Sequence, residues 1–178
     1  MQDILVVVDM QKDFVDGALG SAEAVSIVPR VTQRVAEAAQ RGERVYFTRD
    51  THPADYLQTQ EGSLLPVEHC IEGSEGWQII AQLAEYAQGR PVLNKPTFGS
   101  TLLGETLRRE NERESIGRIT LIGLCTDICV ISNALLLKAY LPEVPIAVDA
   151  SCCAGVTPES HRSALSAMKV CQIGVINE

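Results

Sequence analysis

A cysteine that could act as a nucleophile lies in residues 119–130, ITLIGLCTDICV. Cys129 follows a short apolar, β-branched run and then Gly123, a pattern that predicts a buried strand ending in a sharp turn. We expect Thr126 or Asp127 to cap the next helix, so that Cys129 lies in its first turn. Free N–H groups and the helix dipole there favour a thiolate and can bind an oxyanion. From this stretch alone, the alternative is a small apolar cysteine packed beneath a helix.

Two charged side chains follow other predicted strands. Asp9 comes directly after residues 4–8, an apolar run typical of a central parallel strand. Lys95 follows a shorter predicted strand at 92–93 and precedes a proline. Ligands of open α/β sheets bind outside the carboxyl ends of the strands, so we expect Asp9, Lys95 and Cys129 to share that edge. For Lys95 the alternative is a solvated lysine.

Four candidate metal ligands lie in the long segment between residues 50 and 77. One residue separates Asp50 from His52, and Glu61 and His69 could complete a shell suited to zinc, manganese or iron. The segment lacks periodicity and exceeds the usual few residues of a connection, which is typical of a functional loop. The alternative is a polar surface loop with two unrelated histidines.

Strands and helices alternate along the chain. Strands are predicted at residues 4–8, 45–48, 92–93, 119–122, 144–148 and 174–176, and helices at 26–41, 77–88, 100–114, about 126–139 and 158–170. Thr157 is the expected N-cap of the last helix. This order predicts the α/β class, with a mainly parallel six-stranded sheet in a three-layer α/β/α, Rossmann-like architecture.

Length, charge and cysteine content limit the function classes. The 178 residues predict a single domain over 1–178 with reduced cysteines, because a chain of this size needs no disulfide framework. A formal charge of -8 excludes nucleic acid and anionic membranes as expected partners. No apolar run approaches the roughly 20 residues of a membrane span, and Asp3 stands where a signal peptide would be basic. We expect a cytoplasmic homo-oligomer that binds a small molecule.

Three separated segments carry a family resemblance: VVVDMQKDF, NKPTFGS and GLCTDICV. In this order they resemble the isochorismatase-like cysteine hydrolases, a family of nicotinamidases, ureido-group amidases and isochorismatases. The resemblance covers nearly the whole chain and implies the isochorismatase-like hydrolase fold with a catalytic triad of Asp9, Lys95 and Cys129. It also implies a non-proline cis peptide at Leu124–Cys125, which would aim the amides of Cys125 and Cys129 at one oxyanion.

The resemblance extends to a metal and a substrate pocket. Nicotinamidases hold a divalent ion beside the triad, and their pattern implies zinc, or manganese or iron, on Asp50, His52, Glu61 and His69. Phe14 matches the aromatic residue that these enzymes stack on the pyridine ring. Leu65 stands where they usually carry a tryptophan, which is a departure from the pattern.

These observations favour an amidohydrolase of the nicotinamidase type. It would release ammonia from a small planar amide, nicotinamide to nicotinate, through a thioester on Cys129. Asp9 would move protons, and Lys95 would favour the charged forms of Asp9 and Cys129. One alternative is a ureido or carbamoyl amidohydrolase with a vestigial metal loop, and another is a non-catalytic binding protein on this fold. An isochorismatase needs no thiol, so Cys129 argues against that activity.

Overall fold

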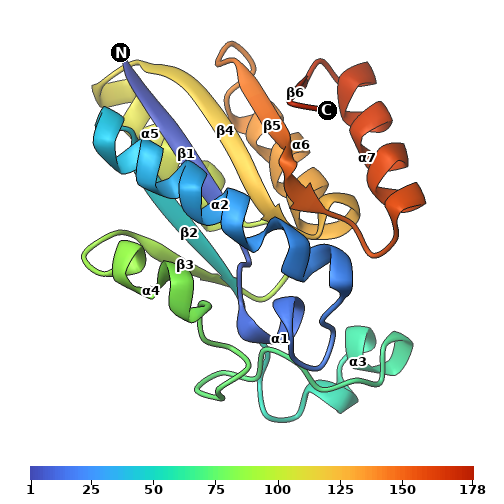
Figure 1. The fold of residues 1–178 in the computed structure, drawn as a ribbon. Coiled ribbons are helices and arrows are strands. Elements are labelled where there is room, and N and C mark those ends of the chain that lie inside the picture. Colours follow the sequence, from blue (N-terminus) through green and yellow to red (C-terminus); the bar gives the residue numbers. More distant parts are fainter.

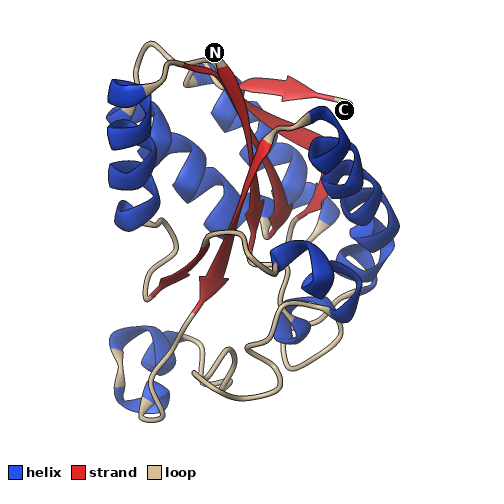
Figure 2. Ribbon diagram, turned by 90° about the vertical axis from the view of Figure 1, so that its left-hand side faces the viewer, coloured by secondary structure: helices blue, strands red, loops and turns tan.

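The structure contains one six-stranded sheet between two layers of helices, seen from two sides in Figures 1 and 2. It is a computed structural model that describes residues 1–178. The strands are β1 (Gln2–Val8), β2 (Arg44–Asp50), β3 (Val92–Lys95), β4 (Ile116–Leu124), β5 (Ile146–Ala154) and β6 (Gly174–Ile176). They lie in the order β3-β2-β1-β4-β5-β6, and all neighbours are parallel. The predicted α/β class and layers are confirmed, and the sheet is wholly rather than mainly parallel.

Helices cover both faces of this sheet. They are α1 (Lys12–Val15), α2 (Ala22–Arg41), α3 (Gln60–Leu64), α4 (Ala81–Ala87), α5 (Thr101–Arg113), α6 (Ile131–Tyr140) and α7 (Pro158–Val170). One face packs against α2 and α4, and the other against α5, α6 and α7, whereas α1 and α3 lie near the carboxyl ends of the strands (Figure 1). None of these helices combines the length and the apolar character needed to cross a bilayer.

The central strand β1 is buried on both faces, which explains its unbroken apolar sequence. Val6 and Val8 belong to the apolar cluster beneath α5–α7, whereas Leu5 and Val7 belong to the cluster beneath α2. Asp9 follows this strand at the edge where the carboxyl ends of all the parallel strands meet. That edge is where open α/β sheets bind their ligands.

The predicted helix over residues 77–88 is wrong in its first four residues, because α4 begins only at Ala81. Residues 77–80 are not helical. Their backbone is tied to the segment after β1, since the N–H of Ile80 donates to the carbonyl of Met10 at 3.0 Å. A tertiary contact, which local periodicity cannot reveal, therefore replaces the first helical turn.

Strands β4 and β5 are both longer than predicted. The predicted strand at 144–148 falls short of β5 because Cys153 also pairs with β4, opposite Gly123. The predicted sharp turn at Gly123 is wrong, since β4 continues through Leu124. Gly123 has a φ of 115°, and a Cβ there would lie 2.1 Å from the carbonyl oxygen of Val8. Only glycine fits this close approach of two central strands.

Other boundaries follow from capping. Helix α2 begins at Ala22, before the predicted residue 26, because the Ser21 side chain caps it. The segment between residues 50 and 77 is not structureless, since it contains a short 3₁₀ helix and α3. Helix α7 has the predicted bounds 158–170, and Thr157 is its N-cap as expected.

Candidate active site

Asp9, Lys95 and Cys129 form a buried cluster at the carboxyl edge of the sheet. Lys95 Nζ lies 2.7 Å from Asp9 Oδ2 and 3.4 Å from Cys129 Sγ. Lys95 is only 1% exposed, so it is not the solvated lysine of the alternative interpretation. Burial lowers the pKa of the Lys95 ammonium, but Asp9, Cys129 and Asp50 together outweigh burial, so the pKa of Lys95 is raised. The cluster therefore holds a permanent positive charge beside a thiol.

The backbone of Asp9 and a neighbouring hydroxyl orient its carboxylate. Asp9 has a φ of 47°, and its Oδ1 accepts a hydrogen bond of 2.6 Å from Thr48 Oγ1. Oδ2 faces the Lys95 ammonium and has no other donor. Burial raises the pKa of Asp9 although Lys95 opposes it. The sequence analysis did not predict Thr48 as a site residue. The feature that could have indicated it is a hydroxyl side chain near the end of an apolar strand.

The environment of Cys129 differs from the one expected at a helix start. Burial, and after it the charge of Asp9, raises the pKa of the Cys129 thiol well above its usual range, and Lys95 opposes this only in part. The resting group is therefore a thiol beside a carboxylate, not the thiolate that the helix dipole alone would favour. A thiol in this position needs a base to remove its proton, and Asp9 is the adjacent candidate.

Cys129 lies in a π-helical turn, Thr126–Val130, that precedes α6. The N–H of Val130 donates across five residues to the carbonyl of Cys125 at 3.0 Å. Cys129 therefore lies in the first turn of the helical stretch as predicted, but that turn is a π turn and not an α-helical one. A π turn inside or beside an α-helix is frequent at functional sites.

The predicted caps, Thr126 and Asp127, do not cap this turn. Thr126 Oγ1 instead lies 2.7 Å from His161 Nδ1, and the Asp127 carboxylate accepts from the N–H of Val156 at 3.2 Å. Both side chains thus fasten the π turn that carries Cys129 to α7 and to the segment before it. Tertiary partners have replaced the local capping bonds.

The cis peptide implied by the resemblance is present at Leu124–Cys125. The N–H of Cys125 donates to no backbone or side-chain acceptor in the protein. This free amide borders the same cavity as Cys129. It is therefore available to a substrate oxygen.

Asp50, His52, Glu61 and His69 each bring one ligand atom into a group whose members lie within 4.8 Å of one another. His52 Nε2 lies 3.0 Å from Asp50 Oδ2 and 3.7 Å from Glu61 Oε1. His69 Nδ1 lies 2.8 Å from the carbonyl of Val67, which makes Nδ1 the protonated nitrogen and leaves Nε2 free as a ligand. Two imidazoles and two carboxylates fit a divalent ion such as zinc, so these histidines are not unrelated surface residues.

Asp50 links this group to the triad. Its Oδ1 lies 3.1 Å from Lys95 Nζ, while its Oδ2 faces His52. The buried side chain of Gln11 makes hydrogen bonds to both backbone groups of Asp50. It donates to the Asp50 carbonyl at 2.8 Å and accepts from the Asp50 N–H at 2.7 Å. Gln11 was not predicted as a site residue; its signal is a polar side chain two positions after Asp9.

A cavity of about 190 Å³ opens over Cys129. Its walls are mainly apolar, and both predicted substrate residues, Phe14 and Leu65, contribute to them. The ring of Phe14 lies 5.6 Å from that of His69. The residues lining the cavity are Phe14, Leu19, Asp50, Glu61, Leu64, Leu65, His69, Phe98, Cys125, Ile128 and Cys129. The thiol thus faces an apolar space with the metal-ligand group at its side.

Known proteins agree with this arrangement. Residues 3–177 match the family described as Isochorismatase domain. The chain belongs to the isochorismatase family. This confirms the resemblance that the three sequence segments carried.

Solved structures of this family resemble the chain over nearly its full length. A pyrazinamidase of Pyrococcus horikoshii in complex with zinc has a TM-score of 0.85 and 25% identity, covering 100% of both chains. The nicotinamidase/pyrazinamidase PncA of Bacillus subtilis has a TM-score of 0.83 and 29% identity, covering 98% of this chain and 99% of that one. An N-carbamoylsarcosine amidase of Thermoplasma acidophilum has a TM-score of 0.78 and 26% identity, covering 98% of this chain and 95% of that one.

Asn133 is a buried polar residue of this isochorismatase-family site that the sequence analysis missed. Its Nδ2 donates to the carbonyls of Cys129 at 2.8 Å and Phe98 at 3.2 Å, and its Oδ1 accepts from the N–H of Ser100 at 2.9 Å. It therefore ties the π turn that carries Cys129 to the loop that follows Lys95. Its signal is a polar residue within the apolar sequence of α6.

Replacing Asn133 with alanine is expected to lower the free energy of unfolding by about 2–4 kcal/mol, because three backbone groups, two of them buried, lose their partner. It should also lower kcat, since the backbone at Cys129 and the loop after Lys95 would no longer be hydrogen-bonded to the same side chain. Asn111→Ala is the matched control, because Asn111 Oδ1 accepts from the N–H of Ile116 at 2.8 Å at the other end of the sheet. Denaturant unfolding and steady-state kinetics measure both effects, and an equal kcat in the two variants would contradict the bracing role.

Proposed function

We propose that the protein is an amidohydrolase of the nicotinamidase type that converts a small planar amide, nicotinamide in the first place, into its acid and ammonia. The observation that carries this proposal is the buried Asp9–Lys95–Cys129 cluster beneath an apolar cavity that is bordered by a group of four candidate metal ligands. Family membership and the nicotinamidase relatives support hydrolysis of an amide C–N bond. The cavity suits one flat ring, and Phe14 offers that ring an aromatic contact.

In the first half-reaction, Asp9 removes the thiol proton as Cys129 Sγ attacks the amide carbon. The backbone N–H groups of Cys125 and Cys129 receive the oxyanion of the tetrahedral intermediate. Asp9 returns its proton to the departing nitrogen, the C–N bond breaks, and ammonia leaves behind a thioester. Lys95 stays charged throughout and balances the negative charge that moves between Asp9 and the sulfur.

In the second half-reaction, Asp9 removes a proton from water as the water oxygen attacks the thioester carbon. The same two amides bind the new oxyanion. The C–S bond then breaks, Cys129 regains its proton, and the carboxylic acid leaves. The single carboxylate therefore serves as base and acid in turn, which its raised pKa favours.

Asp50, His52, Glu61 and His69 are the residues that would hold a divalent ion, with zinc as our first expectation. Such an ion would supply a Lewis-acidic centre for a donor atom of the substrate, directly or through water. Three of these residues, Asp50, Glu61 and His69, line the cavity, so an ion held there would lie beside the ring while the carboxamide faces Cys129.

A ureido or carbamoyl amidohydrolase is the second candidate, because the chain also resembles an N-carbamoylsarcosine amidase. A carbamoyl amino acid carries a carboxylate, and a site for it needs a cation. The only cation in contact with the cluster is Lys95, which already faces Asp9 and Asp50. The intact, largely buried ligand group also argues against a vestigial metal loop. Both features favour an uncharged aromatic amide.

Ammonia release from a panel of amides tests the proposal. The panel contains nicotinamide, benzamide and N-carbamoylsarcosine, each with and without prior chelation of metal. We expect turnover of nicotinamide that chelator lowers and zinc restores. If only N-carbamoylsarcosine were turned over, and chelator had no effect, the nicotinamidase proposal would be wrong and the second candidate would take its place.

Removing a histidine of the ligand group should weaken metal binding. His69→Ala is expected to raise the dissociation constant of zinc on the order of 100-fold or more, since even the loss of an outer partner costs 10–100-fold. Calorimetric zinc titration of the metal-free protein measures this without reference to activity. His161→Ala is the matched control, because His161 contacts Thr126 and lies outside the group. Equal zinc affinity in both variants would contradict the assignment.

A further inference from the structure

A second cavity, of about 300 Å³, adjoins the catalytic one. It is lined by Gln60, Glu61, Leu64, Thr97 and Phe98. Glu61, Leu64 and Phe98 line both cavities, so the two lie side by side. A ring placed over Cys129 therefore has a second space beside it.

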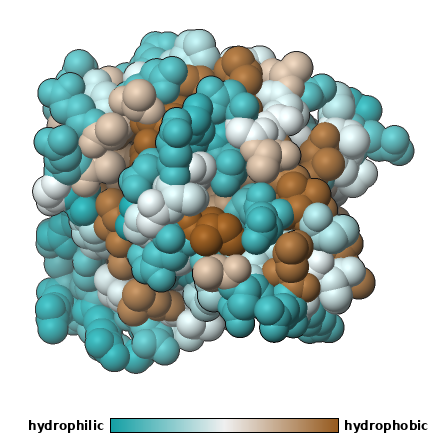
Figure 3. Space-filling model, turned by 90° about the horizontal axis from the view of Figure 1, so that it is seen from below, coloured by the Kyte–Doolittle hydropathy of each residue, from teal (hydrophilic) through white to brown (hydrophobic).

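Two exposed apolar side chains stand at the junction of the cavities. Leu64 is 81% exposed and Phe98 is 46% exposed. They come from distant segments, α3 and the loop between β3 and α5, yet they border the same opening. Figure 3 views the molecule from this end, where apolar side chains lie among hydrophilic ones. Exposed apolar surface that borders a pocket is typical of a ligand-binding rim.

We propose that this outer cavity is a second substrate subsite, which takes an uncharged and largely apolar substituent on the ring of the amide. The inference rests on the proposed amidohydrolase function and extends it to a substrate class: ring-substituted planar amides are preferred over the bare ring. The size of the inner cavity supports this, because 190 Å³ lies below the roughly 300–1,000 Å³ of pockets for larger ligands. A ring fills the inner space, and a substituent needs the outer one.

The charges around the two cavities define the substituent. Glu61 belongs to both linings and Asp50 to the inner one, whereas neither lining contains a lysine or arginine. The ammonium of Lys95 is buried and occupied by Asp9 and Asp50. The charge of an ion on the ligand group would be balanced by Asp50 and Glu61, so a carboxylate on the substituent would find no cationic side chain in either lining, while an alkyl group would cover Leu64 and Phe98.

Gln60 offers a way to close the outer cavity alone, because it lines that cavity and not the inner one. Gln60→Trp places a large ring there. Gln58→Trp is the matched control, since Gln58 is an exposed glutamine two residues earlier that lines neither cavity. The probes are nicotinamide, its 5-propyl and 6-propyl derivatives, and the corresponding ring propionates.

The readout is the ratio of kcat/KM for each derivative to that for nicotinamide, within each variant. We expect at least one propyl derivative to exceed nicotinamide by about fivefold or more in the wild type, because buried methylene groups add affinity. The propionates should fall about tenfold below the propyl compounds. Gln60→Trp should abolish the propyl preference, and Gln58→Trp should retain it. A preference that is absent from the wild type, or unchanged in Gln60→Trp, would overturn the proposal.

A binding experiment separates this proposal from the proposed function. Calorimetry on Cys129→Ala gives dissociation constants that need no turnover. If the wild type released no ammonia from any probe, the amidase function would fail. Tighter binding of a propyl derivative than of nicotinamide, lost in Cys129→Ala/Gln60→Trp, would still support the subsite, and equal binding would refute it.

Discussion

Replacing Cys129 with alanine is expected to lower kcat/KM for nicotinamide on the order of 10⁴-fold or more, because loss of a nucleophile removes the covalent route altogether. The protein should still fold. Cys129 is a small buried residue, and its truncation should cost about 1–2 kcal/mol of the free energy of unfolding. Kinetics and denaturant unfolding measure the two effects separately.

Cys129→Ser tests whether sulfur chemistry or side-chain size matters. Serine keeps the size and a hydrogen-bonding group, but its hydroxyl is far less acidic than a thiol and the site is built for a thiol beside one carboxylate. We expect a loss comparable to that of alanine. Mass spectrometry of acid-quenched wild type should find the acyl group on the peptide that contains Cys129, and an acyl group elsewhere would contradict the assignment.

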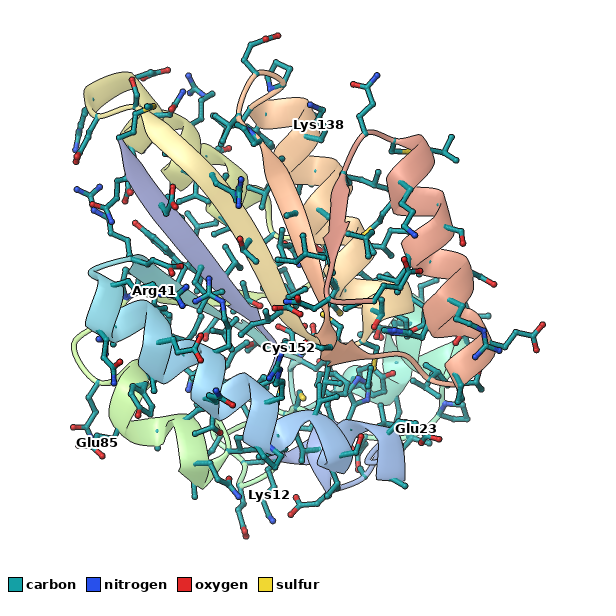
Figure 4. The ribbon with its side chains drawn as sticks, turned by 45° about the horizontal axis from the view of Figure 1, so that its top comes forward. Lys12, Glu23, Arg41, Glu85, Lys138 and Cys152 are labelled. Carbon is teal, nitrogen blue, oxygen red and sulfur yellow. The ribbon has the colours of Figure 1, made fainter.

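Two other cysteines serve as controls. Cys171 is exposed at the end of α7, and Cys152 lies on β5 in the apolar cluster beneath α2 (Figure 4). Neither lines the cavity over Cys129. Cys171→Ser and Cys152→Ala should therefore keep kcat. Loss of turnover in either, with turnover retained in Cys129→Ala, would show that the wrong sulfur had been chosen.

The parallel sheet explains why the location of the site could be predicted from sequence. Apolar runs that end in a charged residue mark strand ends, and parallel strands bring those ends to one edge. Asp9 and Lys95 lie 86 positions apart in the chain, yet β1 and β3 flank β2 and deliver them to the same place. The register of Asp50 with Lys95 completes this geometry. The single domain, the homo-oligomer and the cytoplasmic location stay predictions.

Other features depend on tertiary partners that no local pattern encodes. Thr126 has the composition of a helix cap but bonds to His161 on α7, so the π turn could not be predicted. Gln11 and Asn133 are ordinary polar residues in sequence, and their roles appear only from their backbone partners. Burial and then Asp9 raise the pKa of Cys129, and both depend on segments that are distant in the sequence.

The effect of Lys95 on that protonation can be measured. Removing Lys95 alone would leave two buried carboxylates without their cation, which costs roughly 3–5 kcal/mol. We therefore place Lys95→Met in an Asp9→Asn background, and Cys171→Ser removes the exposed competing thiol. The readout is the pH dependence of Cys129 alkylation by iodoacetamide, because only the thiolate reacts.

The direction of each shift follows from the charges around the sulfur. Asp9 raises the pKa of Cys129, so Asp9→Asn should move the alkylation midpoint to lower pH. Lys95 lowers that pKa, so adding Lys95→Met should move the midpoint back up by about one to two pH units. Asp50, the other charged group that acts on the thiol, is unchanged in both proteins. Lys95→Arg in the same background keeps the charge and should leave the midpoint near that of Asp9→Asn.

Turnover provides the second half of the test, with Asp9 intact. Lys95→Arg should reduce kcat strongly although it keeps the charge, because a planar guanidinium does not fit a space where one ammonium contacts Asp9, Asp50 and Cys129. The charge of the side chain at position 95 would then account for the alkylation midpoint, and its shape would account for the loss of kcat. Identical alkylation midpoints with lysine, arginine and methionine at position 95 would mean that the ammonium does not act on the thiol. In that case Lys95 would be a structural partner of the two carboxylates, and Asp9 alone would govern the proton of Cys129.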